Sequence, residues 1–89
     1  MQAHAEEPTA LPLPMPNSTG DELFRMGLLY STGQGGAPVD YVSAHMLFNL
    51  AAMRGSLEAK LYRKELSAEM ASDEVAEAQR QARQWLAQG

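Results

Sequence analysis

The sequence lacks cysteine and isoleucine altogether, and it contains few valines and only two histidines. Without cysteine the chain has no disulfide framework, no thiolate zinc site and no thiol nucleophile. Strands favour β-branched and aromatic residues, whereas the apolar content here is mostly alanine, leucine and methionine. We therefore expect an all-α chain.

Long apolar runs and basic runs are also missing. No apolar stretch approaches the ~20 residues that cross a bilayer, so we expect a soluble chain with no membrane partner. We expect no signal peptide in this sequence. Whether one was removed earlier is left open. The net charge is −4, and acids or glutamines interrupt the cations. Because duplex binding depends on a basic face, we expect no nucleic-acid partner.

Residues 1–18 differ in composition from the rest of the chain. Prolines fix their own backbone and restrict each preceding residue to extended geometry. They stand at Pro8, Pro12, Pro14 and Pro16, and alternate in part with Leu11, Leu13 and Met15. The pattern predicts a disordered proline-rich tail or linker. The alternative is an extended strip whose apolar side chains dock onto an uncovered helix.

The first predicted helix begins at a capping box. Ser18 with Asp21, and Thr19 with Glu22, both have the required spacing of a hydroxyl and an acid. Gly27 lies in the middle of this helix, where glycine costs roughly 1 kcal/mol relative to alanine. We therefore expect a partner helix to approach closely at Gly27.

A glycine-rich loop at 33–38 follows this helix. Gly33 suits the left-handed residue that ends a helix. A phosphate cradle would need a preceding strand and a following Lys-Ser or Lys-Thr pair, which this loop lacks, so the loop is predicted to reverse the chain. Asp40 is the predicted N-cap of the second helix.

The second helix is apolar on two sides. Its stripes are Ala44, Leu47, Phe48, Ala51 and Ala52, and Val42, Met46, Leu50 and Met53. Only a narrow polar strip through His45 and Asn49 remains. This pattern predicts a middle helix packed on two sides, with His45 facing solvent. Gly55, after the cation Arg54, is predicted to end it.

Two more helices are expected, one over about 57–70 and one after Ser72. The predicted inner faces are Ala59, Tyr62, Leu66 and Met70 in the third, and Val75, Ala78, Ala82, Trp85 and Leu86 in the fourth. The fourth is polar over most of its outer surface, which is typical of the capping element of a helical array.

The order of small residues, glycines and aromatics resembles the Sel-one-like repeat, a relative of the tetratricopeptide repeat. The matching positions are Gly27, Tyr30, Gly33, Gly35, Asp40, Ala44, Phe48, Ala51, Ala52 and Gly55. They cover one full repeat, at about 20–55. For these positions the resemblance implies structural roles in helix packing, turn formation and the core.

After residue 55 the pattern departs from the repeat. Arg63-Lys64 stands where Leu-Gly is expected, and no Gly-x-Gly loop follows. We predict a helical-repeat domain over 19–89, in which about 56–88 is a degenerate second repeat or C-terminal cap. The resemblance implies antiparallel αα-hairpins, about four helices, in a right-handed tetratricopeptide-like superhelix. It also implies an adaptor or scaffold from the cytoplasm or periplasm of a bacterium.

The residue pattern offers no recognisable active site or metal site. His45 has only Tyr41 and Asn49 at helical ligand spacing, and both are poor metal ligands. Glu65 and Glu69 share a helix face without an evident acid–base partner. We expect no catalysis, no metal and no cofactor.

The predicted function is binding of another protein or peptide on the inner face of the helices. The predicted contact residues are Arg25, Leu29, Tyr41, His45 and Asn49, and the Met46, Leu50 and Met53 stripe is an alternative groove. A second hypothesis is a structural capping or self-associating unit, because two hairpins are fewer than the three repeats an array usually needs. The first helix would then expose Phe24 and Leu28 and form a homodimer, unless the tail covers it.

Overall fold

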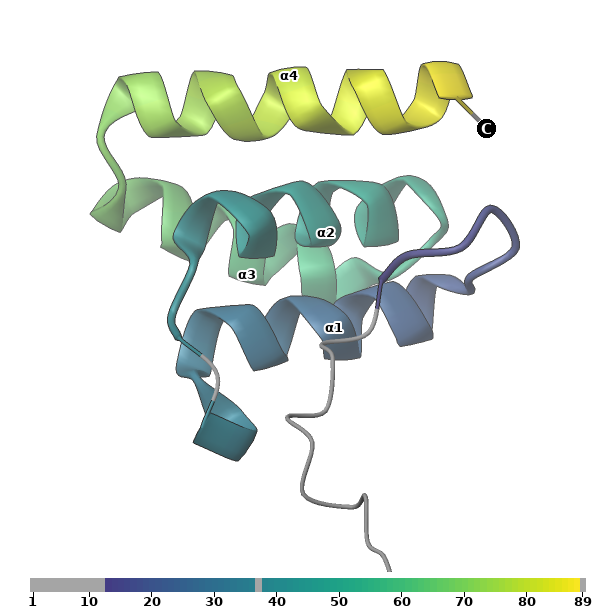
Figure 1. Ribbon diagram of the computed structural model, residues 1–89, viewed down its shortest axis with the longest axis horizontal. Coiled ribbons are helices and arrows are strands. Elements are labelled where there is room, and N and C mark those ends of the chain that lie inside the picture. The colour runs from purple at the N-terminus through teal and green to yellow at the C-terminus, as the bar shows by residue number, and fades with distance from the viewer. Residues whose placement is uncertain (1–12, 37, 89) are drawn as a thin grey trace, which may run out of the picture.

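The computed structural model describes residues 13–36 and 38–88, and the helices there are four α-helices and one short 3-10 turn. In chain order these are α1 (Gly20–Thr32), η2 (Gln34–Gly36), α2 (Tyr41–Met53), α3 (Leu57–Glu69) and α4 (Ser72–Gln88). No strand occurs in the described residues, so the all-α prediction with four helices is confirmed (Figure 1). Within the same residues, no helix combines the length and the apolar character that a membrane span requires.

Side-chain caps present in the sequence set the helix ends. Thr19 Oγ1 accepts a hydrogen bond from the Glu22 amide at 3.0 Å, and the Glu22 carboxylate accepts from the Thr19 amide at 2.8 Å. This is one of the two predicted capping boxes. Asp40 caps α2 by accepting from the Ser43 amide at 3.0 Å, as predicted. Gly33 follows α1 with a φ of 72°, the left-handed geometry expected of it.

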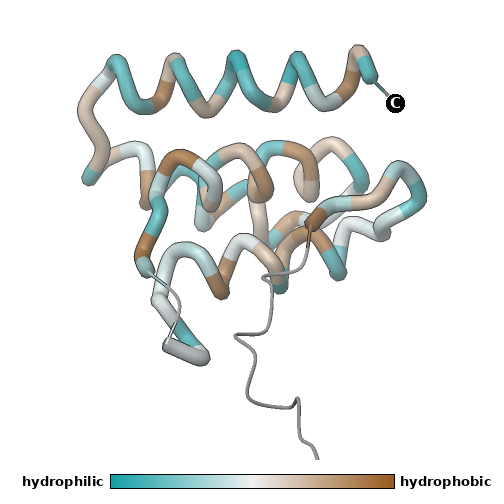
Figure 2. Tube along the Cα trace, in the orientation of Figure 1, coloured by the Kyte–Doolittle hydropathy of each residue, from teal (hydrophilic) through white to brown (hydrophobic). Residues whose placement is uncertain are grey.

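Helix α2 packs against each of the other three α-helices and forms the centre of the fold (Figure 1). Its prediction as a middle helix is therefore confirmed. Helix α4 packs against α2 and makes few contacts with α3, although α3 precedes it in the sequence. Ala78 and Ala82 are buried, and these small side chains let the two helices approach closely. Much of the rest of α4 is hydrophilic (Figure 2).

The core between α1 and α2 is built around Phe48, which is 1% exposed. Its ring centroid lies 5.8 Å from that of Phe24 and 5.7 Å from that of Tyr62 on α3. Opposite the ring lies Gly27, where a Cβ would stand 2.5 Å from the Phe48 Cε1 atom. The predicted close approach at Gly27 is confirmed, and an aromatic ring is what approaches.

The predicted exposure of the first helix is wrong for Phe24, which is only 8% exposed. Tyr62 and Phe48 of the same chain cover it, and the Phe24 and Tyr62 rings meet edge-to-face with centroids 5.1 Å apart. Large apolar side chains are exposed instead on α3, where Leu57 and Leu61 are 76% and 64% exposed. Any self-association through apolar contacts would therefore involve α3 more than α1.

Arg54 holds the segment 13–18 against the helices through hydrogen bonds. Its Nη1 atom donates to the carbonyl oxygens of Pro16 and Ser18 at 2.8 and 2.7 Å. The guanidinium carbon also lies 5.5 Å from the centre of the Trp85 ring, within cation–π range. Arg54 thus joins the segment before α1, the end of α2 and the last turns of α4.

The predicted docking of apolar tail side chains is not what holds this segment. Leu13 and Met15 are 71% and 57% exposed, and Leu11, with the rest of residues 1–12, lies outside the described residues. Pro14 and Pro16 instead line a recess at the end of α4. The contact therefore depends on proline rings and backbone carbonyls.

Candidate functional site

The five predicted contact residues differ in their exposure and in their partners. Arg25 is exposed and forms an ion pair within α1, and Leu29 is half-buried on the same helix. Tyr41 is half-buried and lines a pocket. His45 and Asn49 hydrogen-bond to side chains of α3. Of the five, only Tyr41 lies at the site described below.

The prediction that His45 faces solvent is wrong, since this residue is only 2% exposed. Its Nε2 atom lies 2.8 Å from Ser67 Oγ, and one turn further along α2 Asn49 Oδ1 accepts from Arg63 Nη1 at 2.6 Å. Helix α3 thus covers the polar strip of α2 with matching polar side chains. Periodicity correctly separated the strip from the apolar stripes, but it could not show that polar groups would cover it.

The hydrogen bonds around His45 favour the tautomer that carries its proton on Nε2. The Ser67 hydroxyl donates to the Arg63 carbonyl at 2.9 Å, so its oxygen accepts from the His45 Nε2–H group. The His45 Nδ1 atom is then an unprotonated, buried acceptor without a hydrogen-bond partner in the described part of the chain. Burial, followed by the nearby positive charge of Arg63, lowers the pKa of His45 below its ordinary value of 6.5.

Mild acid is expected to destabilise the fold through His45. In the unfolded chain His45 takes up a proton near pH 6.5, whereas the folded chain resists protonation until lower pH. The unfolded state therefore binds more protons in this window. The free energy of unfolding should fall as the pH drops from 7.5 through 6.5 toward the lowered pKa, by at most about 1.4 kcal/mol per pH unit.

Urea unfolding of the wild type and of His45→Gln, at pH 7.5 and at pH 5.5, measures this effect. Glutamine keeps an N–H donor for Ser67 but does not titrate. The loss between the two pH values should be smaller in the variant. An equal loss in the two proteins would show that another group carries the pH dependence.

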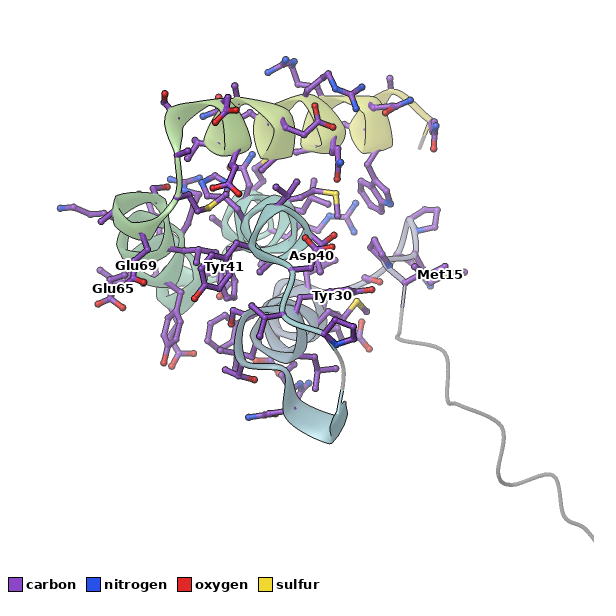
Figure 3. The ribbon with its side chains drawn as sticks, turned by 60° about the vertical axis from the view of Figure 1, so that its left-hand side comes forward. Met15, Tyr30, Asp40, Tyr41, Glu65 and Glu69 are labelled. Atoms are coloured by element: carbon purple, nitrogen blue, oxygen red, sulfur yellow. The ribbon has the colours of Figure 1, made fainter. Side chains whose placement is uncertain are left out.

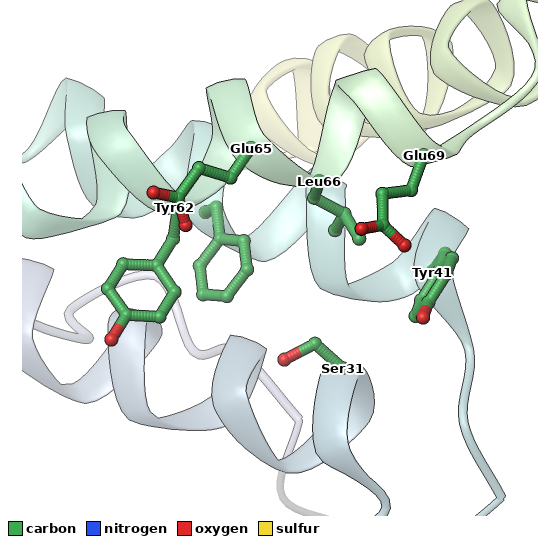
Figure 4. Close-up of a pocket in the computed structure, with 7 residues that line it drawn as sticks. Ser31, Tyr41, Tyr62, Glu65, Leu66 and Glu69 are labelled. Atoms are coloured by element: carbon green, nitrogen blue, oxygen red, sulfur yellow. The ribbon is translucent and has the colours of Figure 1, made fainter.

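A pocket of about 190 Å³ lies between α1, α2 and α3 (Figure 4). Its lining residues are Ser31, Tyr41, Phe48, Tyr62, Glu65, Leu66 and Glu69. In Figure 4 Tyr62 and Tyr41 stand at opposite ends, with the Glu65 carboxylate beside Tyr62, the Glu69 carboxylate toward Tyr41, and Ser31 across on α1. Figure 3 shows Tyr41, Glu65 and Glu69 on the same side of the molecule. The pocket therefore combines apolar surface, three aromatic rings and two carboxylates.

The charge in this pocket is negative and uncompensated. Neither Glu65 nor Glu69 has an ion-pair partner within residues 13–36 and 38–88, and no cation lines the pocket. Glu77 on α4 shows the contrasting case. Hydrogen bonds from Arg80, and then from Gln81, lower the pKa of Glu77 to about 2. Among the described residues no such cation pairs with the pocket carboxylates, which can attract one from outside.

The groups in the pocket suit binding better than a reaction. The Ser31 hydroxyl donates to the Leu28 carbonyl at 3.2 Å, and no histidine lines the pocket to activate it. In the part of the chain that the structure describes, no three His, Asp or Glu side chains gather as a metal site would require. The arrangement offers apolar contact, aromatic faces and negative charge.

Comparison with protein-family models, with curated proteins and with solved structures gave no significant match to this chain. Membership of the Sel-one-like repeat family therefore stays a prediction, and it is supported by the residue pattern of the chain alone.

Sequence reasoning identified part of the pocket without recognising it as a site. Tyr62, Glu65 and Glu69 recur at offsets of three and four residues, which place them on one side of α3. The sequence therefore showed that the two glutamates share one face of α3. Their position beside Ser31 and Tyr41 depends on how α3 packs against the first two helices, which helical spacing does not specify.

Proposed function

We propose that this chain is a protein-interaction module, of the adaptor or scaffold type, that docks a segment of another protein in the pocket between α1, α2 and α3. The observation that carries the proposal is the composition of this pocket. Phe48 and Leu66 supply apolar surface, Tyr41 and Tyr62 supply aromatic faces, and no part of the described chain fills the space. The resemblance to a protein-binding helical repeat points the same way.

The size and shape of the pocket favour a peptide side chain over a small metabolite. Pockets that hold small molecules usually enclose about 300–1,000 Å³ and bury most of the ligand. This pocket is smaller, at about 190 Å³, and opens to solvent. One or two side chains of an extended segment would fit it, while the rest of the segment could lie along α1 and α3.

Selection from a random-peptide display library tests this function. Ser31→Phe should block the pocket, because Ser31 lines it from α1 and is partly exposed. Ala76→Phe is the matched control, since Ala76 is exposed on α4 and does not line the pocket. We expect selected peptides that bind the wild type and the control but lose binding to Ser31→Phe. Peptides that bind all three proteins equally, or no selected binder, would contradict the proposal.

Self-association is a second candidate function, and the exposure of Leu57 and Leu61 favours it. These side chains lie one turn apart on α3 and are 76% and 64% exposed. If they form an interface, the sedimentation coefficient should rise with protein concentration. The double variant Leu57→Gln with Leu61→Gln should abolish that rise. A wild type that sediments as a monomer at all concentrations would contradict this alternative.

A further inference from the structure

We infer that the segment docking in this pocket carries a cationic side chain, arginine or lysine, beside an apolar one. The inference rests on the proposed function and adds the chemistry of the partner. It depends on the placement of Glu65 and Glu69 relative to the tyrosine rings and the apolar surface of the pocket.

The two carboxylates lie on one side of α3, and each stands near a tyrosine ring (Figure 4). Glu65 and Glu69 are four residues apart on α3, a spacing that puts Cβ atoms about 5–6 Å apart on the same side of a helix. Both carboxylates lie on the α3 side of the pocket in Figure 4. A guanidinium or ammonium group in the pocket can donate to either carboxylate, and such charge-assisted hydrogen bonds are stronger than neutral ones.

The remaining lining of the pocket suits the rest of such a side chain. Tyr41 and Tyr62 present aromatic rings at its two ends, and a cation within about 6 Å of a ring centroid gains a cation–π attraction. Phe48 and Leu66 offer apolar surface. Arginine and lysine pack their methylene stems on such surface while the charged group stays in water. A neighbouring apolar side chain of the segment can use the same surface.

Charge argues against occupants that come from this chain. Residues 1–12 contain two glutamates, Glu6 and Glu7, and neither lysine nor arginine, so they offer no side chain of the inferred kind. A second copy brings a net charge of −4 to a site that is already negative. Like charge opposes that association at low ionic strength. A basic segment of a different protein is therefore the occupant that the charges favour.

The peptide selection that tests docking also tests this inference. We expect one position of the pocket-dependent peptides to be enriched in arginine or lysine, next to a position enriched in apolar residues. Replacing the selected arginine with citrulline, or the selected lysine with norleucine, removes the charge at nearly constant size. This replacement should weaken binding roughly tenfold at low salt, as expected when a charge contact and a ring contact are lost together.

Variants of the protein give the reciprocal measurement. The double variant Glu65→Gln with Glu69→Gln should bind the cationic peptide several-fold more weakly and distinguish it less from its neutral form, since only the ring contacts remain. The control is Glu58→Gln with Asp73→Asn, which removes two exposed carboxylates that do not line the pocket. It should bind like the wild type. Added salt should weaken binding to the wild type and the control more than binding to the pocket double variant.

The possible outcomes test the cationic preference and the proposed docking function separately. If pocket-dependent peptides are selected but lack a cationic preference, or bind equally in charged and neutral forms, the inference is wrong and docking stands. If the two double variants lose affinity equally, the effect comes from net charge and the inference is wrong. If no peptide depends on the pocket, docking itself fails and the inference with it.

Discussion

Replacing Phe48 with alanine is expected to lower the free energy of unfolding by about 3–5 kcal/mol. The ring is 1% exposed and contacts helices on two sides, with Phe24 on α1 and Tyr62 on α3. Its removal leaves a cavity that these neighbours can fill only in part. Domains are stable by roughly 5–15 kcal/mol, so this substitution should remove a large share of the total stability.

Urea unfolding followed by circular dichroism measures this loss. Phe48→Leu should lose less than Phe48→Ala because it keeps most of the apolar volume. Tyr62→Phe is the control at the edge of the same cluster, where the side chain is 43% exposed, and it should change stability by less than about 1 kcal/mol. If Phe48→Ala lost no more than this control, Phe48 would not be the centre of the core.

Gly27→Ala is expected to destabilise the fold by about 1–2 kcal/mol, although alanine is the better helix former by roughly 1 kcal/mol. The added Cβ would lie 2.5 Å from Phe48 Cε1 and 2.6 Å from Cδ1, closer than nonbonded carbon atoms approach. The ring is held between Phe24 and Tyr62 and cannot move without disturbing both. Overpacking of this kind typically costs 1–3 kcal/mol, which exceeds the gain in helix propensity.

A smaller side chain at position 48 should reverse the effect of Gly27→Ala. In the Phe48→Leu background the clash is relieved, so the same substitution should be neutral or stabilising. The double-mutant cycle would then show a coupling energy of about 1 kcal/mol or more. Ala76→Gly, at an exposed position of α4, measures the effect of helix propensity on stability without a change in core packing. Additive effects at positions 27 and 48 would contradict the packing explanation.

The helices and their caps could be predicted because they depend on neighbours in sequence. Thr19 bonds to a residue three positions away, and so does Asp40. Gly33 needs only its own backbone freedom at a φ of 72°. Such interactions lie within one helical turn, so a sequence pattern of a few residues contains all the groups that form them.

The candidate site could be predicted only in part because it depends on groups far apart in sequence. The His45–Ser67 pair spans 22 residues and the Arg54–Pro16 contact spans 38. Nothing in the helical period of α2 shows that a polar strip will be covered by a polar face of α3. The expected solvent-facing binding surface was wrong at His45 for this reason.

By itself, the sequence determined four helices, the N-terminal caps of the first two, a central second helix and the close approach at Gly27, because local hydrogen bonds and helical periodicity set these features. The tertiary structure alone decided that α4 packs on α2 and that His45 is buried. It also brought Glu65 and Glu69 of α3 to one pocket with Tyr41 of α2 and Ser31 of α1. The physical reason is that an amphipathic helix specifies which face it buries, whereas its partner depends on how the apolar faces of all four helices are covered together.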